Sequence, residues 1–225
     1  MKKMIAGFVA LAGIAAGAQA QTATLDLKVW NGESWVNSVD VLPGATVQAA
    51  MFIGFTDAYG FGGAVYNIQG NNLAAGDSVS ITGGDNGRQA GFNFGAATQQ
   101  VYTSGSSFRI DAANDAGNSV NAGIASTQRD PVSAGPAFKT DNPALVYRFT
   151  ITLGADGSVR TINLSSPLDQ LKGGVVGLYA TANSTRPTNT QNVSIDGAAI
   201  NVIPTPATLA LVGLGGLVAG RRRSR

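Results

Sequence analysis

The stretch ALVYRFTITL, residues 144–153, alternates between two kinds of position. The first set is apolar or aromatic and comprises Leu145, Tyr147, Phe149, Ile151 and Leu153. The second set is smaller or polar and comprises Ala144, Val146, Arg148, Thr150 and Thr152. A period of two residues is typical of a β-strand that buries one face. We therefore predict a strand here, with Leu145, Phe149 and Ile151 buried and Arg148 exposed.

The same period recurs on both sides of this stretch. The turn GADG, residues 154–157, follows it, and residues 159–164 are predicted to return as its hairpin partner. Further strands are predicted at 25–29, 39–41, 47–55, 64–69, 78–82, 99–103, 108–111, 175–181 and 193–202. About ten short strands between Gly, Asn and Asp turns favour an all-β fold, either a single β-sandwich or a jelly roll.

Residues 111–143 break the pattern, because they are rich in small and polar residues and carry three prolines, Pro131, Pro136 and Pro143. We interpret this segment as a solvated connection, with a binding lobe as the alternative. It contains four oxygen-bearing side chains of the kind that bind calcium: Asp111, Asn114, Asp115 and Asn118. Their spacing departs from that of a calcium loop, so calcium binding stays open.

The composition removes several classes of chemistry. The chain contains no cysteine and no histidine. Disulfides, thiolate zinc sites and Ser-His-Asp triads are therefore excluded, and we expect no zinc, haem or other cofactor. Glu33 is the only glutamate, but the aspartates would still allow a glycan hydrolase. We predict a non-enzymatic role, and the glycan hydrolase is the third candidate function.

The whole chain has a net charge of +2, but its central region is acidic. Of the fifteen basic residues, six lie in the two terminal segments. Residues 21–203 hold nine basic and thirteen acidic residues, nine minus thirteen giving −4. Nucleic-acid binding requires a basic patch for the phosphates, so nucleic acid is not expected as a partner.

The N-terminus has the order of a secretory signal peptide. Lys2 and Lys3 precede an apolar run over residues 4–17. The small residues Ala18 and Ala20 then form an A-x-A cleavage site with Gln19 between them. We predict a signal peptide over residues 1–20, with Gln21 as the first mature residue.

The C-terminus has the order of a membrane segment. Pro204-Thr205-Pro206 precedes an apolar run over residues 207–220, and the basic block closes the chain with Arg221, Arg222, Arg223 and Arg225. A helix over that run would be about 21 Å long, shorter than the bilayer core of about 30 Å. We expect a transient anchor, with the arginines on the cytoplasmic side.

This arrangement of Pro204, Thr205, Pro206, the apolar run and Arg221, Arg222 and Arg223 resembles the PEP-CTERM sorting signal. Thr205 stands where that family usually has glutamate, which leaves processing open. The resemblance implies an exosortase-like processing enzyme as partner, a transient stay in the inner membrane and then a place on the cell surface or outside the cell. It also implies an extracellular-matrix or biofilm setting with exopolysaccharide. The predicted organisation is a signal over 1–20, an exported domain over 21–203 and a sorting signal over 204–225.

The domain also resembles cohesin-like β-sandwiches at its start. Residues 41–47, VLPGATV, are followed by a glycine-rich turn and strand over 60–66, GFGGAVY. This similarity implies a β-sandwich with a binding or display role. The matching residues include no catalytic residues.

Trp30 is the candidate ligand contact, because it lies opposite the apolar face of residues 25–29. An exposed tryptophan can stack on a sugar ring, whereas a tryptophan at the rim of the core is the commoner case. Trp35 shares the phase of Val39 and Val41 and is expected in the core. The predicted function is structural or interactive, with a secreted carbohydrate-binding module as the alternative.

We predict that surface protein begins at Gln21 and ends near residues 204–206. N-terminal sequencing and mass spectrometry of the exported protein measure both ends. Replacing Arg221, Arg222, Arg223 and Arg225 by serine should release unprocessed protein, because each arginine in the bilayer core costs about 2.5–3.5 kcal/mol. Wild-type surface protein that retains peptides through Arg225 would show that the tail is a permanent anchor.

Overall fold

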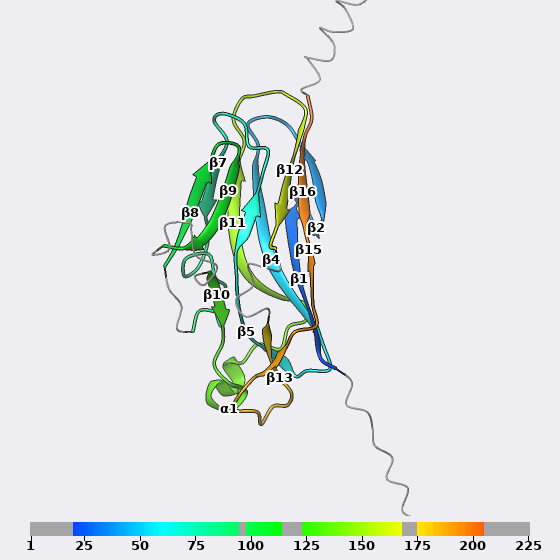
Figure 1. Ribbon diagram of the computed structural model, residues 1–225, viewed down its shortest axis with the longest axis vertical. Coiled ribbons are helices and arrows are strands. Elements are labelled where there is room, and N and C mark those ends of the chain that lie inside the picture. Colours follow the sequence, from blue (N-terminus) through cyan, green and yellow to red (C-terminus); the bar gives the residue numbers. More distant parts are fainter. Residues whose placement is uncertain (1–19, 95–97, 114–122, 168–174, 205–225) are drawn as a thin grey trace, which may run out of the picture.

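The structure is a computed structural model that describes residues 20–94, 98–113, 123–167 and 175–204. Within these residues, sixteen strands form three sheets. Two six-stranded sheets, A and B, are the layers of a β-sandwich, and a four-stranded sheet, C, lies toward one end (Figure 1). The all-β sandwich predicted from the sequence is confirmed.

The strand order gives each sheet its edges. Sheet A has the order β15 (Val193–Asp196), β1 (Thr22–Trp30), β4 (Thr46–Thr56), β11 (Ala144–Thr152) and β7 (Ser78–Ile81), with β2 (Trp35–Val36) paired to β1. Sheet B has the order β3 (Ser38–Val41), β16 (Ala198–Val202), β12 (Arg160–Ser165), β6 (Ile68–Gly70), β9 (Ser107–Ala112) and β8 (Gln99–Ser104). Sheet C has the order β10 (Ile124–Thr127), β5 (Gly60–Tyr66), β13 (Val176–Tyr179) and β14 (Thr188–Thr190).

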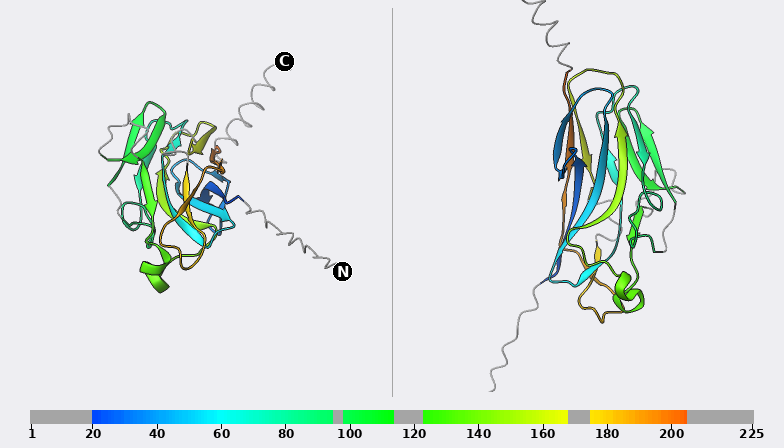
Figure 2. Two further views of the ribbon diagram at one scale, coloured as in Figure 1. Left: turned by 60° about the horizontal axis from the view of Figure 1, so that its bottom comes forward. Right: turned by 180° about the vertical axis from the view of Figure 1, so that it is seen from behind.

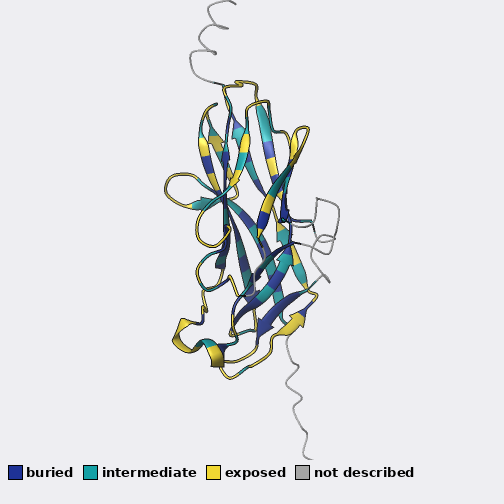
Figure 3. Cartoon of the chain, turned by 90° about the vertical axis from the view of Figure 1, so that its left-hand side faces the viewer, coloured by how far each residue is buried: buried dark blue, intermediate teal, exposed yellow. Residues whose placement is uncertain are grey.

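The core lies between the inner faces of the sheets. In β1, Leu25, Leu27 and Val29 are completely buried, and the residues between them are half-buried. Figure 3 shows this alternation of buried and more exposed positions along the strands. The period of two therefore turns one face of each strand inward and leaves the other available to solvent.

A β-bulge in β11 changes which residues of the 144–153 stretch face the core. Leu145 pairs with Phe52 of β4 and Tyr147 with Met51, so Val146 is an extra residue between them. Phe149 and Ile151 are buried, as predicted. Leu145 and Arg148 are both half-buried, so the predictions of a buried Leu145 and an exposed Arg148 are wrong. The inserted Val146 turns Leu145 away from the core, because it shifts the pairing by one residue.

The segment after β7 holds the bulge in place. The N–H of Gln89 donates to the carbonyl oxygen of Val146 at 3.1 Å, and the N–H of Arg148 donates to that of Gly87 at 2.7 Å. Gly87 has a φ of 85°, and a Cβ on it would lie 2.6 Å from the ring of Tyr147. Glycine is required here both by the backbone angle and by the close approach.

The predicted hairpin of 144–153 with 159–164 is also wrong. β11 lies in sheet A between β4 and β7, whereas β12 lies in sheet B between β16 and β6. Residues 153–159 therefore cross from sheet A to sheet B, and residues 71–77 make the reverse crossing from β6 to β7. A Gly/Asp turn fits a hairpin and a crossover equally well, so local sequence does not choose between them.

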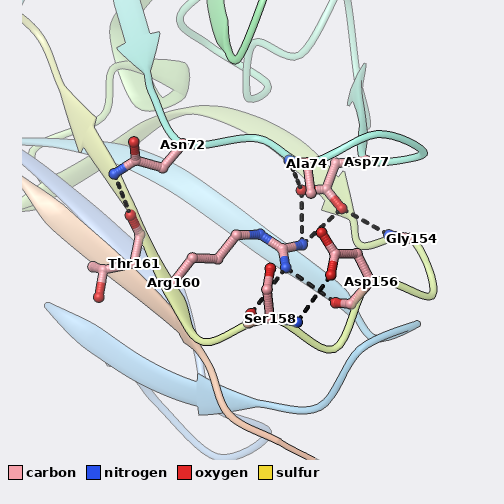
Figure 4. Close-up of polar contacts among 8 residues, drawn as sticks. All are labelled: Asn72, Ala74, Asp77, Gly154, Asp156, Ser158, Arg160 and Thr161. Carbon is pink, nitrogen blue, oxygen red and sulfur yellow. Dashed lines mark hydrogen bonds and ion pairs between the residues drawn. The ribbon is translucent and has the colours of Figure 1, made fainter.

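A buried ion pair joins these two crossovers (Figure 4). One terminal nitrogen of Arg160 lies 3.0 Å from each carboxylate oxygen of Asp77, and the other donates to the carbonyl oxygen of Asp156 at 3.0 Å. The same carboxylate accepts the N–H groups of Ala74 and Gly154, both at 2.8 Å. The side chain of Asp77 is fully buried and that of Arg160 is 10% exposed. The pair is thus shielded from solvent, with both carboxylate oxygens and both terminal nitrogens bonded, while the Arg160 Nε is buried without an acceptor.

The backbones of the crossovers also come very close. A Cβ on Gly154 would lie 2.9 Å from the carbonyl carbon of Gly76. Asn72 donates to the carbonyl oxygen of Thr161 at 2.9 Å. The N–H of Gly44, in the turn from β3 to β4, donates to the carbonyl oxygen of Gly154 at 2.9 Å. Three connections between sheets A and B therefore meet at one end of the sandwich.

The segment 111–143 contains more structure than predicted. β10 lies within it, and a short helix α1 (Pro131–Ala134) continues into the 3-10 turn η1 (Gly135–Ala137). Asp130 caps α1, because its carboxylate accepts the N–H of Ser133 at 2.9 Å. No helix among the described residues is long and apolar enough to cross a membrane. The apolar run 207–220 lies outside those residues.

Phe149→Ala should lower the free energy of unfolding by about 3–5 kcal/mol, because its fully buried ring packs against that of Phe108 at 6.2 Å. Leu145→Ala is the matched control from the other side of the bulge and should cost less than about 1.5 kcal/mol. Urea unfolding measures both. Equal losses at the two positions would contradict the bulge.

Asp77→Ala should cost about 3–5 kcal/mol, because it leaves the Arg160 guanidinium buried without its carboxylate. The double variant Asp77→Ala/Arg160→Met should cost less than the sum of the single variants. The control is Asp26→Ala in the surface pair Asp26–Lys28, at 2.9 Å, with an expected loss below about 1 kcal/mol. Additive losses at Asp77 and Arg160 would show that the two do not act as one link.

Candidate functional site

The outward face of sheet A carries three aromatic rings and one guanidinium, here called the aromatic ledge: Trp30, Trp35, Phe52 and Arg148. The rings of Trp30 and Trp35 meet edge to face, with centroids 5.3 Å apart, and those of Trp35 and Phe52 meet similarly at 5.6 Å. The guanidinium carbon of Arg148 lies 5.8 Å from the centroid of Trp35. All four residues are half-buried. Trp35 is the centre of the ledge, since it contacts the other three.

The strands position these side chains through pairing. Val29 of β1 faces the core, so Trp30 faces outward, and β2 places Trp35 directly opposite Trp30. Phe52 and Ala50 are two of the outward residues of β4, and Ala50 pairs with Arg148 of β11. Ala50 is completely buried although it points outward. Its small side chain leaves room above the sheet for the larger groups that cover it.

The two basic side chains at the ledge, Lys28 and Arg148, differ in their hydrogen-bond and ion-pair partners. Lys28 pairs with Asp26 at 2.9 Å and donates to the Asn37 side-chain oxygen at 3.3 Å. The Arg148 side chain forms no hydrogen bond and no ion pair with any described residue, and its Nε is buried without an acceptor. Its terminal nitrogens therefore remain available to a ligand. The ledge thus combines half-buried aromatic rings with an unneutralised cation.

The structure brings both tryptophans into this site. Trp30, the candidate predicted from the sequence, is its outermost member along β1. Trp35 was expected in the core, and this is wrong, because β2 pairs with β1 and turns the indole to the outward face. Phe52 and Arg148 were not predicted as site residues. The outward orientation of Phe52 follows from its pairing with Asp26 of β1. The outward orientation of Arg148 depends on a bulge that the sequence does not reveal.

The predicted sorting residues are mostly outside the described part of the chain. Ala18, Thr205, Pro206, Arg221, Arg222 and Arg223 all lie there. Ala20 is the first described residue and Pro204 the last. Gln21 is held against the domain, because its side chain donates to the carbonyl oxygen of Asp57 at 3.1 Å and its own carbonyl accepts the Thr190 hydroxyl at 2.6 Å.

The structure gives Asp111, the first of the four calcium candidates, a different role. Its carboxylate lies 3.1 Å from Arg109 and accepts the N–H of Ala112 at 2.9 Å. The other three, Asn114, Asp115 and Asn118, lie outside the described residues. Among the residues that are described, no group of three acidic, histidine or cysteine side chains is placed to hold a metal.

A buried arginine links sheet C to sheet A. Arg88 is completely buried, and its Nε donates to the carbonyl oxygen of Ala125 in β10 at 2.7 Å. Its backbone forms a bridge with Tyr147 in β11. Burial lowers the pKa of Arg88 and raises the pKa values of Tyr66 and Tyr147. This cluster is interior and joins two sheets, so it is structural.

A second arginine–aromatic pair provides a comparison for the ledge. The guanidinium carbon of Arg129 lies 4.9 Å from the centroid of Phe94, which is 51% exposed. This pair belongs to the depression beside α1, which is lined by Gly91, Asn93, Phe94, Gln128, Arg129, Ser133, Ala134 and Ala137. Like Arg148 and Trp35, this pair places a guanidinium over an aromatic ring, but it has one ring whereas the ledge has three.

No protein-family model matches the chain, and no curated protein matches it. Similar solved structures include the seventh ScaB type I cohesin from Pseudobacteroides cellulosolvens, with 8% identity, 83% of this chain and 94% of that chain covered, and a TM-score of 0.47. A Coh-OlpA complex from Clostridium thermocellum has 9% identity, coverage of 80% and 99%, and a TM-score of 0.48. CaCohA2 from Clostridium acetobutylicum has 11% identity, coverage of 82% and 92%, and a TM-score of 0.43. The site described above rests on this chain's own residues.

Proposed function

We propose that this protein is an exported surface β-sandwich that acts by binding a protein partner at the aromatic ledge. The observation that carries the proposal is the Arg148 guanidinium, which lies on Trp35 and has no hydrogen bond or ion pair among the described residues. Tryptophan and arginine are the residue types that contribute most to binding at protein interfaces. Here both are gathered on the outward face of one sheet.

The partner chemistry follows from the unneutralised guanidinium. Arginine presents several N–H donors in a plane and pairs with a carboxylate through two parallel hydrogen bonds. The rings around it exclude water, which strengthens such a pair. We therefore assign to the partner an acidic side chain surrounded by apolar groups, which would cover Trp30 and Phe52.

The proposed location rests on the two terminal segments. An N-terminal signal and a PEP-CTERM-like tail would carry the domain through the inner membrane, with an exosortase-like enzyme releasing it to the surface or the extracellular matrix. The described domain begins and ends at opposite ends of the sandwich (Figure 2). A tail held in the membrane after Pro204 would place the crossover end nearest the bilayer. The ledge, on the side of the sandwich, would then remain open to a partner.

Binding is proposed rather than catalysis because of what the buried carboxylates do. The side chains of Asp77 and Asp111 are both fully buried, and each is held by an arginine, Arg160 and Arg109 respectively. Carboxylates committed to such pairs have little freedom to act as acid and base. The second candidate function is carbohydrate binding through Trp30, whose indole remains half-exposed at the end of β1.

A photo-crosslinking amino acid at residue 30 should capture one protein on producing cells, because this position lies at the open edge of the ledge. The same group at Phe94, an exposed aromatic outside the ledge, is the control. The captured protein, once purified, should bind wild-type domain and lose about tenfold or more of its affinity for Arg148→Glu. Arg129→Glu is the charge-matched control and should bind normally.

Identical adducts at residues 30 and 94, or equal affinities of the Arg148→Glu and Arg129→Glu variants, would contradict the ledge as the binding surface. A glycan array separates the second candidate. Retention of a sugar by wild type and its loss in Trp30→Ala, without any protein adduct, would favour the carbohydrate function.

A further inference from the structure

The outward face of sheet B contains a groove that is separate from the ledge. It lies over β6, β8 and β9, has a volume of about 420 Å³, and is lined by Gln69, Tyr102, Thr103, Ser104, Ser107, Phe108 and Arg109. Gln69 and Tyr102 both pair with Arg109, one from each side. These three residues therefore form one row across three strands. The volume lies within the range of about 300–1,000 Å³ that is usual for small-molecule sites.

Four polar side chains of the groove have no hydrogen-bond partner among the described residues. The side chains of Gln69, Thr103, Ser104 and Ser107 form no hydrogen bond with any described residue, whereas many other polar side chains of the domain are paired. Together they offer one amide and three hydroxyl groups. An amide and hydroxyls both donate and accept hydrogen bonds, which suits a ligand that carries several hydroxyl groups.

Tyr102 is held in a fixed position beside these groups. Its hydroxyl lies 3.1 Å from the carbonyl oxygen of Ala112 and 3.2 Å from that of Ala113, and it donates to this pair. The ring is therefore tethered by its far end while its body lines the groove. A tethered ring loses little conformational entropy when a flat ligand packs on it.

The charge in the groove is balanced within the protein. Arg109 lies 3.1 Å from Asp111, whose side chain is fully buried. The other groove-lining residues are neutral. The groove therefore lacks the unneutralised cation that distinguishes the ledge, and it does not select an anion.

We propose that this groove binds a neutral oligosaccharide. A sugar ring packs on Tyr102, and its hydroxyl groups bond to the Gln69 amide and to the hydroxyls of Ser104 and Ser107. This inference goes beyond the proposed function, because it concerns the opposite sheet and a different class of ligand. The domain would then have two independent binding faces.

The test titrates the full exported domain, labelled with 15N, with cellohexaose, maltohexaose and mannohexaose, and records amide chemical shifts. At least one hexasaccharide should shift residues of β6, β8 and β9. Tyr102→Ala and Gln69→Ala should each weaken that binding about tenfold or more, whereas Tyr102→Phe, which retains the ring, should weaken it less than about threefold. Phe94→Ala, at an exposed aromatic residue outside both the groove and the ledge, is the control and should bind like wild type.

Shifts with none of the three hexasaccharides would overturn the proposal. So would equal binding by wild type and a Tyr102→Ala variant whose spectrum shows an intact fold. Shifts confined to β1, β2 and β4 would also overturn it and would favour the carbohydrate function of the ledge instead. These outcomes do not depend on whether a protein partner binds at Arg148.

Discussion

The β-bulge at Val146 is the constraint on which both the core and the candidate site depend. Ala144 faces the core opposite Ile53. Without an extra residue, the strand would continue this phase and turn Arg148 inward and Phe149 outward. With the bulge, Phe149 joins the core and Arg148 joins the ledge. The hydrogen bonds from Gln89 and to Gly87 hold the bulge in this form.

The inner and outer faces of the two sheets have different roles. Their inner faces supply the core, and the Asp77–Arg160 pair fixes the crossovers that hold one sheet against the other. Their outer faces are left free and differ in chemistry. Sheet A presents aromatic rings with a cation that has no neutralising partner among the described residues, whereas sheet B presents hydroxyl and amide groups around a tethered ring. One sandwich thus offers two surfaces with different ligand preferences.

The sequence predicted those parts of the fold that depend on local alternation. Residues 25–29 and 47–55 lie in strands because their period of two matches burial on one side, and the all-β sandwich followed from them. Long-range pairing was not predictable in the same way. The GADG turn suggested a hairpin, but Arg160 lies beside Asp77, 83 residues away, and the chain crosses between sheets instead. The bulge leaves no local signal, because Val146 is as apolar as its neighbours.

The candidate site was predicted only in part for the same reason. Trp30 lies opposite an apolar face within one strand, so its outward position could be predicted. Trp35 was misplaced, because a two-residue strand is too short to show a period and its orientation comes from pairing with β1. Arg148 on the ledge requires knowledge of the bulge, and the segment of β10 and α1 is too polar and too short to predict by alternation.

The chain's only two tryptophans, Trp30 and Trp35, both lie in the ledge, so selectively excited tryptophan fluorescence reports on this surface alone. The most direct measurement is acrylamide quenching of that fluorescence in the purified domain, alone and saturated with its purified protein partner, the partner's own tryptophans having been replaced by phenylalanine. Binding at the ledge should cause a clear fall in quenching, because the partner covers both indoles. Unchanged quenching in a complex whose formation is shown independently would contradict the assignment of the ledge as the binding surface.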